Sequence, residues 1–171
     1  MVFKSLNVFE MLIPAMIATA SMMAPPQIDP KQHECLALNI YHEARSESSE
    51  GQIAVAQVTL NRVDHRVWPN TICEVVYDHK QFSWTFLVKD HKPHEKKAWA
   101  VAKVIARDVM IGNVKDPTYG AVYYHANYVN PYWKKHVTLS KVIGAHLFYT
   151  WSEGDAKNAE LNTCLLYTSD A

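Results

Sequence analysis

The sequence lacks the short motifs by which many metal and redox proteins are recognised. Its three cysteines form no Cys-x-x-Cys pair, which argues against a zinc knuckle or a redox motif. Nine histidines are present, yet His42 and Glu43 are not followed by a second histidine at the spacing of the His-Glu-x-x-His pattern of zinc hydrolases. We therefore predict that the protein uses no metal and no other cofactor.

The sequence also lacks an excess of charge of either sign. Seventeen Lys and Arg residues balance seventeen Asp and Glu residues, so no overall field gathers nucleic acid or anionic lipid, and we predict no nucleic-acid partner. Aromatic residues, in contrast, make up 11% of the chain. That supply suits a groove in which sugars stack on rings, and it equally suits an aromatic core.

No internal repeat or low-complexity linker interrupts residues 31–151, which we interpret as one continuous domain. Residues 1–26 resemble a signal peptide, because Lys4 supplies a positive charge, residues 12–24 are almost free of polar groups, and small residues precede Pro25. An uncleaved membrane anchor is the alternative, although an apolar run of about 14 residues is short for a bilayer. In both cases we expect an exported protein.

Residues 152–171 form a tail whose last part looks foreign. Residues 164–171 resemble the translation of an adapter used in sequencing libraries, so Cys164 is left out of the interpretation. The two remaining cysteines, Cys35 and Cys73, leave two alternatives open. An oxidising compartment would favour a disulfide between them, and otherwise they are two buried free thiols.

Apolar periodicity predicts a helical first half. The first helix has the three-to-four spacing of a buried face at Leu36, Ala37, Ile40, Tyr41 and Ala44. Ser49 and Gln52 have the spacing of a capping box before a second helix, residues 53–63, which is apolar nearly all round and therefore central to the core. A third helix is expected to carry Pro93 in its first turn and to stop at Gly112.

The period changes in the second half of the chain. Over residues 119–125 a two-residue period sets Tyr119, Ala121, Tyr123 and His125 against Gly120, Val122 and Tyr124, as on the two faces of a strand. Residues 142–149 are rich in β-branched and aromatic residues. We predict that the two segments pair in a small antiparallel sheet beside a compact helical lobe, with Asn61 and Arg62 bracing the two parts. The fold class is therefore α+β.

Glu43 is the residue whose position carries chemistry. It lies near the end of the first predicted helix, which stops near Arg45, and both burial and the helix dipole disfavour a charged carboxylate there. Its pKa should therefore rise. A carboxyl group that stays protonated near neutral pH can protonate the oxygen of a breaking glycosidic bond. The alternative is a surface ion pair with Arg45 or Arg62.

Several separated blocks occur together in one order. They are ALNIYHEAR at 37–45, EGQIAVA at 50–56, LNRV at 60–63, WPNTIC at 68–73, QFSW at 81–84, GAVYYH at 120–125, Trp133 and IGAHLFY at 143–149. In these blocks, from about Glu34 to Trp151, the chain resembles the SleB-type cell-wall hydrolases, which include spore cortex-lytic enzymes and phage relatives. His42 and Ser46 stand where many relatives carry Ala and Gly.

The resemblance implies a fold like that of lysozymes and lytic transglycosylases, with Glu43 as the catalytic acid and peptidoglycan glycan strands as the partner. A lytic transglycosylase needs one carboxyl group, because the 6-hydroxyl of muramic acid can attack the anomeric carbon and leave a 1,6-anhydro end. A muramidase would need a second carboxylate, for which Glu47 and Glu50 are the near candidates. Two further functions stay open at the level of sequence: an amidase, with or without zinc, and a non-catalytic wall-binding domain.

The remaining site residues are expected to bind sugar or to assist the acid. Those expected to bind acetylated sugars are Gln81, Ser83 and Trp84 on one wall, and Tyr123, His125 and Trp133 on the other. His146 is either an assistant to the acid or a core histidine, and Glu50 either assists or favours the start of the second helix. The resemblance implies a periplasmic or cell-envelope location, or a phage-encoded lysis protein. The sequence does not indicate an oligomeric state.

Overall fold

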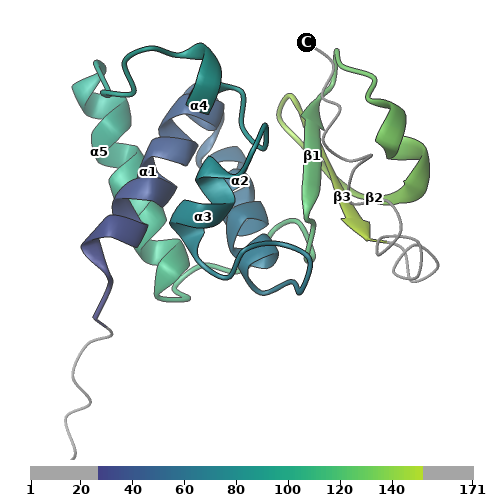
Figure 1. The fold of residues 1–171 in the computed structure, drawn as a ribbon, viewed down its shortest axis with the longest axis horizontal. Helices are drawn as coiled ribbons and strands as arrows, with labels where there is room; N and C mark the ends of the chain where they lie inside the picture. The colour runs from purple at the N-terminus through teal and green to yellow at the C-terminus, as the bar shows by residue number, and fades with distance from the viewer. Residues whose placement is uncertain (1–26, 152–171) are drawn as a thin grey trace, which may run out of the picture.

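The computed structural model describes residues 27–151, which form a helical lobe beside a three-stranded antiparallel sheet (Figure 1). The helices are α1 (Pro30–Ala44), α2 (Ser49–Val63), α3 (Ile72–Tyr77), α4 (Trp84–Leu87), α5 (Lys96–Met110) and the 3-10 helix η1 (Tyr132–His136). The strands are β1 (Tyr123–Ala126), β2 (Val137–Ile143) and β3 (His146–Trp151), in the order β1-β3-β2. The predicted α+β class, with a small sheet, is confirmed.

Helix α1 begins where the sequence supplies a cap. The Asp29 side chain accepts hydrogen bonds from the backbone amides of Lys31 (2.8 Å) and Gln32, and Pro30 occupies the first helical turn, where a missing N–H costs nothing. The predicted apolar face is confirmed, because Leu36 and Ile40 are fully buried and pack against the other helices. The helix therefore carries Glu43 in its last turn at a fixed place in the lobe.

Helix α2 begins one residue earlier than the predicted capping box requires. Ser48 is the cap, and its side chain accepts a hydrogen bond from the Gly51 amide at 3.2 Å. The predicted pairing of Ser49 with Gln52 is wrong, because glycine occupies the position from which a side chain would close the box. Gln52 instead donates its side-chain amide to the backbone carbonyl of Glu47 at 3.1 Å.

Helix α5 begins at Lys96, so Pro93 precedes the helix and does not lie in its first turn as predicted. The Tyr41 hydroxyl accepts hydrogen bonds from the backbone amides of His94 and Glu95, at 3.2 Å each, and this holds the chain outside the helix until Lys96. The predicted stop is confirmed, since the helix ends at Met110 and Gly112 adopts a left-handed φ of 72°.

The sheet differs from the prediction at both of its expected strands. Residues 142–149 are not one strand: Gly144, with a φ of 56°, turns the chain between β2 and β3, which pair with each other in antiparallel fashion. The strand predicted over residues 119–125 begins only at Tyr123, because the Asp116 carboxylate accepts the amides of Thr118 (2.7 Å) and Gly120 (2.8 Å) and folds that segment into a turn.

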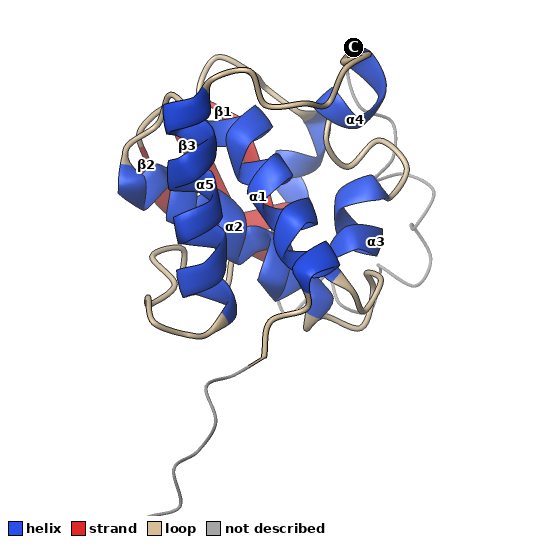
Figure 2. Cartoon of the chain, turned by 90° about the vertical axis from the view of Figure 1, so that its left-hand side faces the viewer, coloured by secondary structure: helices blue, strands red, loops and turns tan. Residues whose placement is uncertain are grey.

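The α-helices lie on one side of the sheet (Figure 2). Ala54, Val55 and Val58 of α2 pack on Phe148 of β3, and together they form the apolar contact between the lobe and the sheet. Side chains at the end of α2 brace this contact as predicted. Asn61 donates to the carbonyl of Ala121 at 2.9 Å, and Arg62 donates to the carbonyl of Val122 at 2.8 Å.

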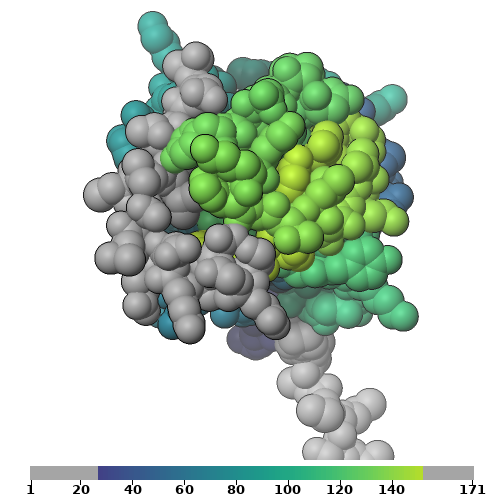
Figure 3. Space-filling model, turned by 90° about the vertical axis from the view of Figure 1, so that its right-hand side faces the viewer, coloured from purple at the N-terminus to yellow at the C-terminus, as the bar shows by residue number. Residues whose placement is uncertain are grey.

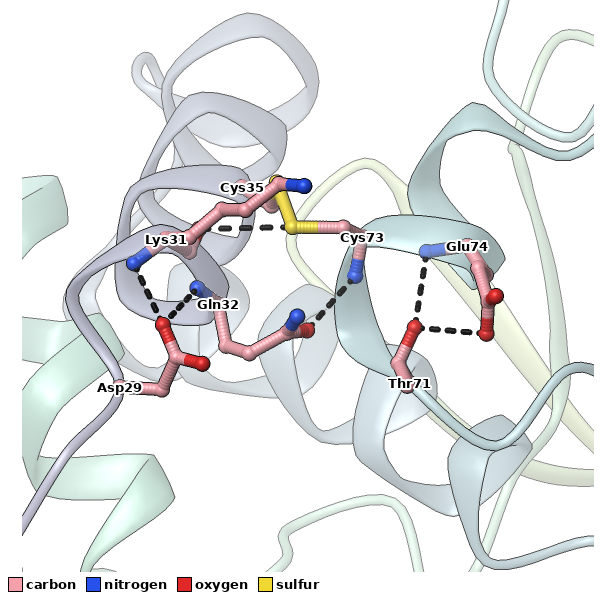
Figure 4. The surroundings of a disulfide bond; sticks show 7 residues. All are labelled: Asp29, Lys31, Gln32, Cys35, Thr71, Cys73 and Glu74. Carbon is pink, nitrogen blue, oxygen red and sulfur yellow. Dashed lines mark hydrogen bonds between the residues drawn. A yellow bond between two sulfur atoms is a disulfide. The ribbon is translucent and has the colours of Figure 1, made fainter.

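A disulfide joins α1 to α3 (Figure 4). Cys35 and Cys73 lie with their Cα atoms 5.3 Å apart, and the Gln32 side chain accepts the backbone amide of Cys73 at 2.9 Å beside the bond. The predicted signal segment, residues 1–26, and the tail with Cys164 lie outside the described residues. Within residues 27–151 no helix is long and apolar enough to cross a membrane.

Candidate active site

Glu43 is partly exposed in the last turn of α1 and faces strand β1. The Tyr124 hydroxyl donates a hydrogen bond to Glu43 Oε2 at 3.0 Å. Burial raises the pKa of Glu43, while the Tyr124 hydrogen bond and the charge of Arg62 oppose that rise and lower it by less. The balance favours the neutral acid, and a position near the carboxyl end of a helix favours it further.

Of the two cations considered as partners of Glu43, Arg45 is paired elsewhere and Arg62 is a buried residue whose charge acts on Glu43. Arg45 pairs with Glu95, with 2.9 Å between Arg45 Nε and Glu95 Oε1. Arg62 is buried, donates to the carbonyl of Val122, and lies over the rings of Trp68 and Phe82. Glu43 is therefore not drawn into an exposed ion pair with Arg45.

Tyr124 is a donor that stays protonated. Its ring packs on Phe148 (5.6 Å between centroids) and edge-on against His146 (5.4 Å). Burial first, and then the nearby Glu43 carboxyl, raise the pKa of Tyr124 well above its ordinary value. Because Glu43 Oε2 accepts from this hydroxyl, the proton of the neutral acid is best carried on Oε1.

The residues predicted for the opposite wall lie on the other face of the sheet. Tyr123 and His125 alternate with Tyr124 along β1, so they point away from Glu43. The Tyr123 and Trp133 rings lie 5.3 Å apart, and His125 Nε2 contacts the Tyr149 hydroxyl at 2.8 Å. Figure 3 views the molecule from this side, where the strands and η1 make up much of the described surface. These three residues come together, but not with Glu43.

The residues predicted for the first wall divide between core and surface. Trp84 is buried, donates its indole N–H to Asn39 Oδ1 at 3.0 Å, and stacks on the His42 ring at 4.5 Å. Ser83 is exposed just before α4, and Gln81 is partly exposed. Trp84 thus lies behind His42, the residue next to Glu43, and the two polar residues remain near the surface.

His146 and one glutamate form a second polar contact beside Tyr124. His146 Nδ1 lies 3.7 Å from Glu47 Oε1, and both side chains are largely buried. Glu50, in contrast, is exposed in the first turn of α2, where its negative charge interacts favourably with the helix dipole. Of the two glutamates considered as second carboxylates, Glu47 is the one that reaches the residues around Glu43.

Two further features lie away from Glu43. An open cavity of about 1030 Å³ lies at the other end of α1, where it is lined by Lys31, Cys35, Trp68 and Tyr77 among others. Among residues 27–151, no group of three or more His, Cys, Asp or Glu side chains is arranged to hold a metal ion.

The comparison with protein families identifies the chain. A family model described as Cell Wall Hydrolase matches residues 46–149. The chain belongs to the cell wall hydrolase family. The matched segment contains Tyr124, Glu47 and His146 and begins just after Glu43.

Relatives of this cell wall hydrolase match a larger share of the chain than the family model does. The spore cortex-lytic enzyme of Oceanobacillus iheyensis is 31% identical over 135 residues, which cover 76% of this chain and 45% of that protein. The chain thus spans less than half the length of that relative. The catalytic domain of the germination-specific lytic transglycosylase SleB from Bacillus anthracis has a TM-score of 0.60 at 30% identity and covers 74% of this chain and all of its own. The catalytic domain of the Bacillus cereus SleB protein has a TM-score of 0.57 at 31% identity, over 73% and 94% of the two chains.

Sequence reasoning missed Tyr124, the donor to Glu43, and considered Glu47 in a different role. Tyr124 stands between the two residues predicted from β1, and alternation alone does not say which face of a strand turns toward the helices when both faces are aromatic. The sequence suggests Glu47 only as a second carboxylate. The signal that could have singled it out is its place in the short connection between two helices, four residues after Glu43.

Proposed function

We propose that this cell wall hydrolase cuts the glycan strands of peptidoglycan between N-acetylmuramic acid and N-acetylglucosamine, as a lytic transglycosylase. The observation that carries the proposal is the hydrogen bond from Tyr124 to a partly exposed Glu43 whose pKa is raised by burial. A carboxyl group with a raised pKa is a better proton donor than an ordinary glutamate, and a partly exposed one is within reach of a substrate. The Bacillus anthracis relative is described as a lytic transglycosylase, which supports the same reaction class.

The reaction needs one carboxyl group in two roles. Glu43 gives its proton to the glycosidic oxygen as the bond from that oxygen to the anomeric carbon of muramic acid breaks. The 6-hydroxyl of the same muramic acid then attacks the anomeric carbon, and the Glu43 carboxylate takes the hydroxyl proton. The products are a 1,6-anhydromuramic end and a new sugar hydroxyl. No water is consumed, and Glu43 ends in the protonated state in which it began.

Mass spectrometry of the fragments released from purified peptidoglycan tests this proposal. We expect muropeptides that are lighter than their hydrolysed counterparts by one water, as 1,6-anhydro ends require. Reducing ends would identify a muramidase, and freed stem peptides would identify an amidase. Wall that is bound in a pelleting assay but never cleaved would identify a binding domain. Any of the last three results contradicts the proposal.

We also propose that the protein works outside the cytoplasm, in the periplasm or cell envelope. Its substrate lies there, and the disulfide between Cys35 and Cys73 supports an oxidising compartment. Export through residues 1–26, with or without cleavage, belongs to the same proposal. A fusion of those residues to a reporter that is active only after export tests it directly, and a reporter that stays inactive would contradict it.

Replacing Tyr124 by Phe should change both the rate and its pH dependence. The ring contacts remain, but Glu43 loses the donor that orients it, so we expect kcat to fall by about tenfold. A hydrogen bond to the carboxylate lowers its pKa, so its loss raises the pKa of Glu43. Activity, which needs the protonated acid, should therefore persist to higher pH than in the wild type. An alkaline limb that stays in place or moves to lower pH would contradict this.

A further inference from the structure

The side chain of Glu47 is enclosed between the helical lobe and the sheet. It lies in the connection between α1 and α2, and its backbone is fixed at both ends: its amide donates to the carbonyl of Ala44 at 2.9 Å, and its carbonyl accepts from Gln52. The side chain is only 16% exposed. A carboxyl group with so little contact with water must be held there by specific partners.

Two glycines make room for this side chain. A Cβ added to Gly51 of α2 would lie 2.9 Å from the Glu47 Cβ, and one added to Gly144 would overlap Glu47 Oε2. Gly144 is also the left-handed residue that turns β2 into β3. The helix connection and the sheet turn therefore meet at Glu47, and each approaches it more closely than a side chain would allow.

Glu47 accepts a hydrogen bond from that turn and lies close to the strand after it, without a hydrogen bond to His146 Nδ1. The Ala145 amide donates to Glu47 Oε2 at 3.4 Å, and Oε1 lies 3.7 Å from His146 Nδ1. Burial lowers the pKa of His146, and the charge of Glu47 opposes this by less. The contact with His146 is therefore not a strong ion pair, and what Glu47 supplies is an acceptor for the Ala145 amide more than a charge.

His146 in turn packs on the residue that holds the acid. Its ring stands edge-on to Tyr124, whose hydroxyl donates to Glu43 at 3.0 Å. A continuous series of contacts thus leads from Glu47 through the turn and His146 to Tyr124 and Glu43. Both ends of the series lie on the same short stretch of chain, since Glu43 and Glu47 are separated by three residues.

We propose that Glu47 is a positioning residue: it fixes the turn between β2 and β3 so that Tyr124 is held against Glu43, and it takes no part as a second catalytic carboxylate. The proposal rests on the function proposed for Glu43. In this proposal, Glu47 acts through the length of its side chain and through its acceptor oxygens. A second catalytic carboxylate would instead need the charge and the acidity.

Two substitutions separate these possibilities, because one keeps the length of the Glu47 side chain and the other keeps its charge. Glu47→Gln removes the charge but keeps the length and an acceptor for Ala145, so we expect kcat within about threefold of wild type. Glu47→Asp keeps the charge but is one methylene too short to reach the turn, so we expect kcat to fall about tenfold with KM little changed. Glu34, exposed on α1, provides the matched control, and Glu34→Gln and Glu34→Asp should leave activity unchanged.

A double-mutant cycle tests whether Glu47 acts through Tyr124. In a Tyr124→Phe background, Glu47→Asp should lower kcat much less than it does in the wild type, because the hydrogen bond that it misplaces is already gone. Circular dichroism and the melting temperature of each variant show whether it is folded. If Glu47→Asp does not fold, Glu47→Asn, which shortens the side chain in the same way, takes its place in the cycle with the same expected result.

Two results would overturn the proposal. One is strictly multiplicative losses of kcat in the cycle, and the other is a Glu47→Gln variant that is inactive while Glu47→Asp retains activity. Failure of the function proposed for Glu43 has a different signature, since activity would then survive Glu43→Gln. The two failures can therefore be told apart with the same assay.

Discussion

Replacing Glu43 by glutamine should lower kcat on peptidoglycan by roughly a thousandfold, because the amide cannot give a proton to the departing sugar oxygen. Glutamine has the size of glutamate, and its side-chain oxygen can still accept the Tyr124 hydroxyl, so the fold should be kept. Binding to purified wall should be nearly unchanged. The measurements are initial rates of release of soluble muropeptides, together with pelleting of the variant on insoluble wall.

Glu34→Gln, the same change on the same helix at an exposed position, is the matched control and should behave as wild type. Clearing of wall by Glu43→Gln at the wild-type rate would remove the mechanism. It would leave open an amidase whose chemistry lies elsewhere. Loss of wall binding together with turnover would show instead that Glu43 mainly supports the fold or the groove.

Removing the disulfide should have the largest effect on stability. Cys35 and Cys73 are 38 residues apart, and closing a loop of that length stabilises a fold by about 3 to 4 kcal/mol through the unfolded chain. The double variant Cys35→Ser, Cys73→Ser should therefore unfold at clearly lower denaturant concentration. A Cys164→Ser background avoids mispaired thiols, and the free energy of unfolding is measured with and without a reductant.

The activity of the same double variant is the control that separates a loss of stability from damage to the active site. Cys35 lies in the first half of α1 and Glu43 in its last turn, so the variant should keep nearly wild-type kcat at temperatures where it is folded. Reductant should destabilise the parent protein but not the double variant. A loss of stability below about 1 kcal/mol would contradict the assignment of a structural disulfide.

The helical half of the fold could be predicted well because its signals are local. The three-to-four spacing in α1 and the apolar run in α2 specify which faces are buried, and both appear as expected. Boundaries were less certain because they depend on single contacts. Tyr41 delays the start of α5, and Gly51 prevents the predicted capping box.

The sheet was harder to predict because its signals are not local. Gly144 divides one β-rich segment into two strands, and a glycine within a run of strand-forming residues can equally mark a bulge. The face of β1 that turns toward the helices was also undetermined. Tyr124 faces Glu43 because α2 and Phe148 pack on that side, which is a property of the assembled lobe and not of the alternation.

In the candidate site, the sequence predicts which types of residue matter better than it predicts where they lie. Glu43 could be chosen from the resemblance and from its place near a helix end, and the structure adds the donor that orients it. Trp84 was predicted to stack on sugar because of its type. It lies in the core because its indole N–H finds a buried partner in Asn39.

The pKa of Glu43 in the folded protein tests the central claim most directly. It can be measured from the side-chain carbon resonance of selectively labelled glutamate, assigned by comparison with Glu43→Gln, as the pH is varied. The account predicts a pKa above the ordinary glutamate value of 4.5, rising further when Tyr124 is replaced by Phe. A pKa at or below that value would mean that Glu43 is charged at neutral pH, and the proposed acid would be contradicted.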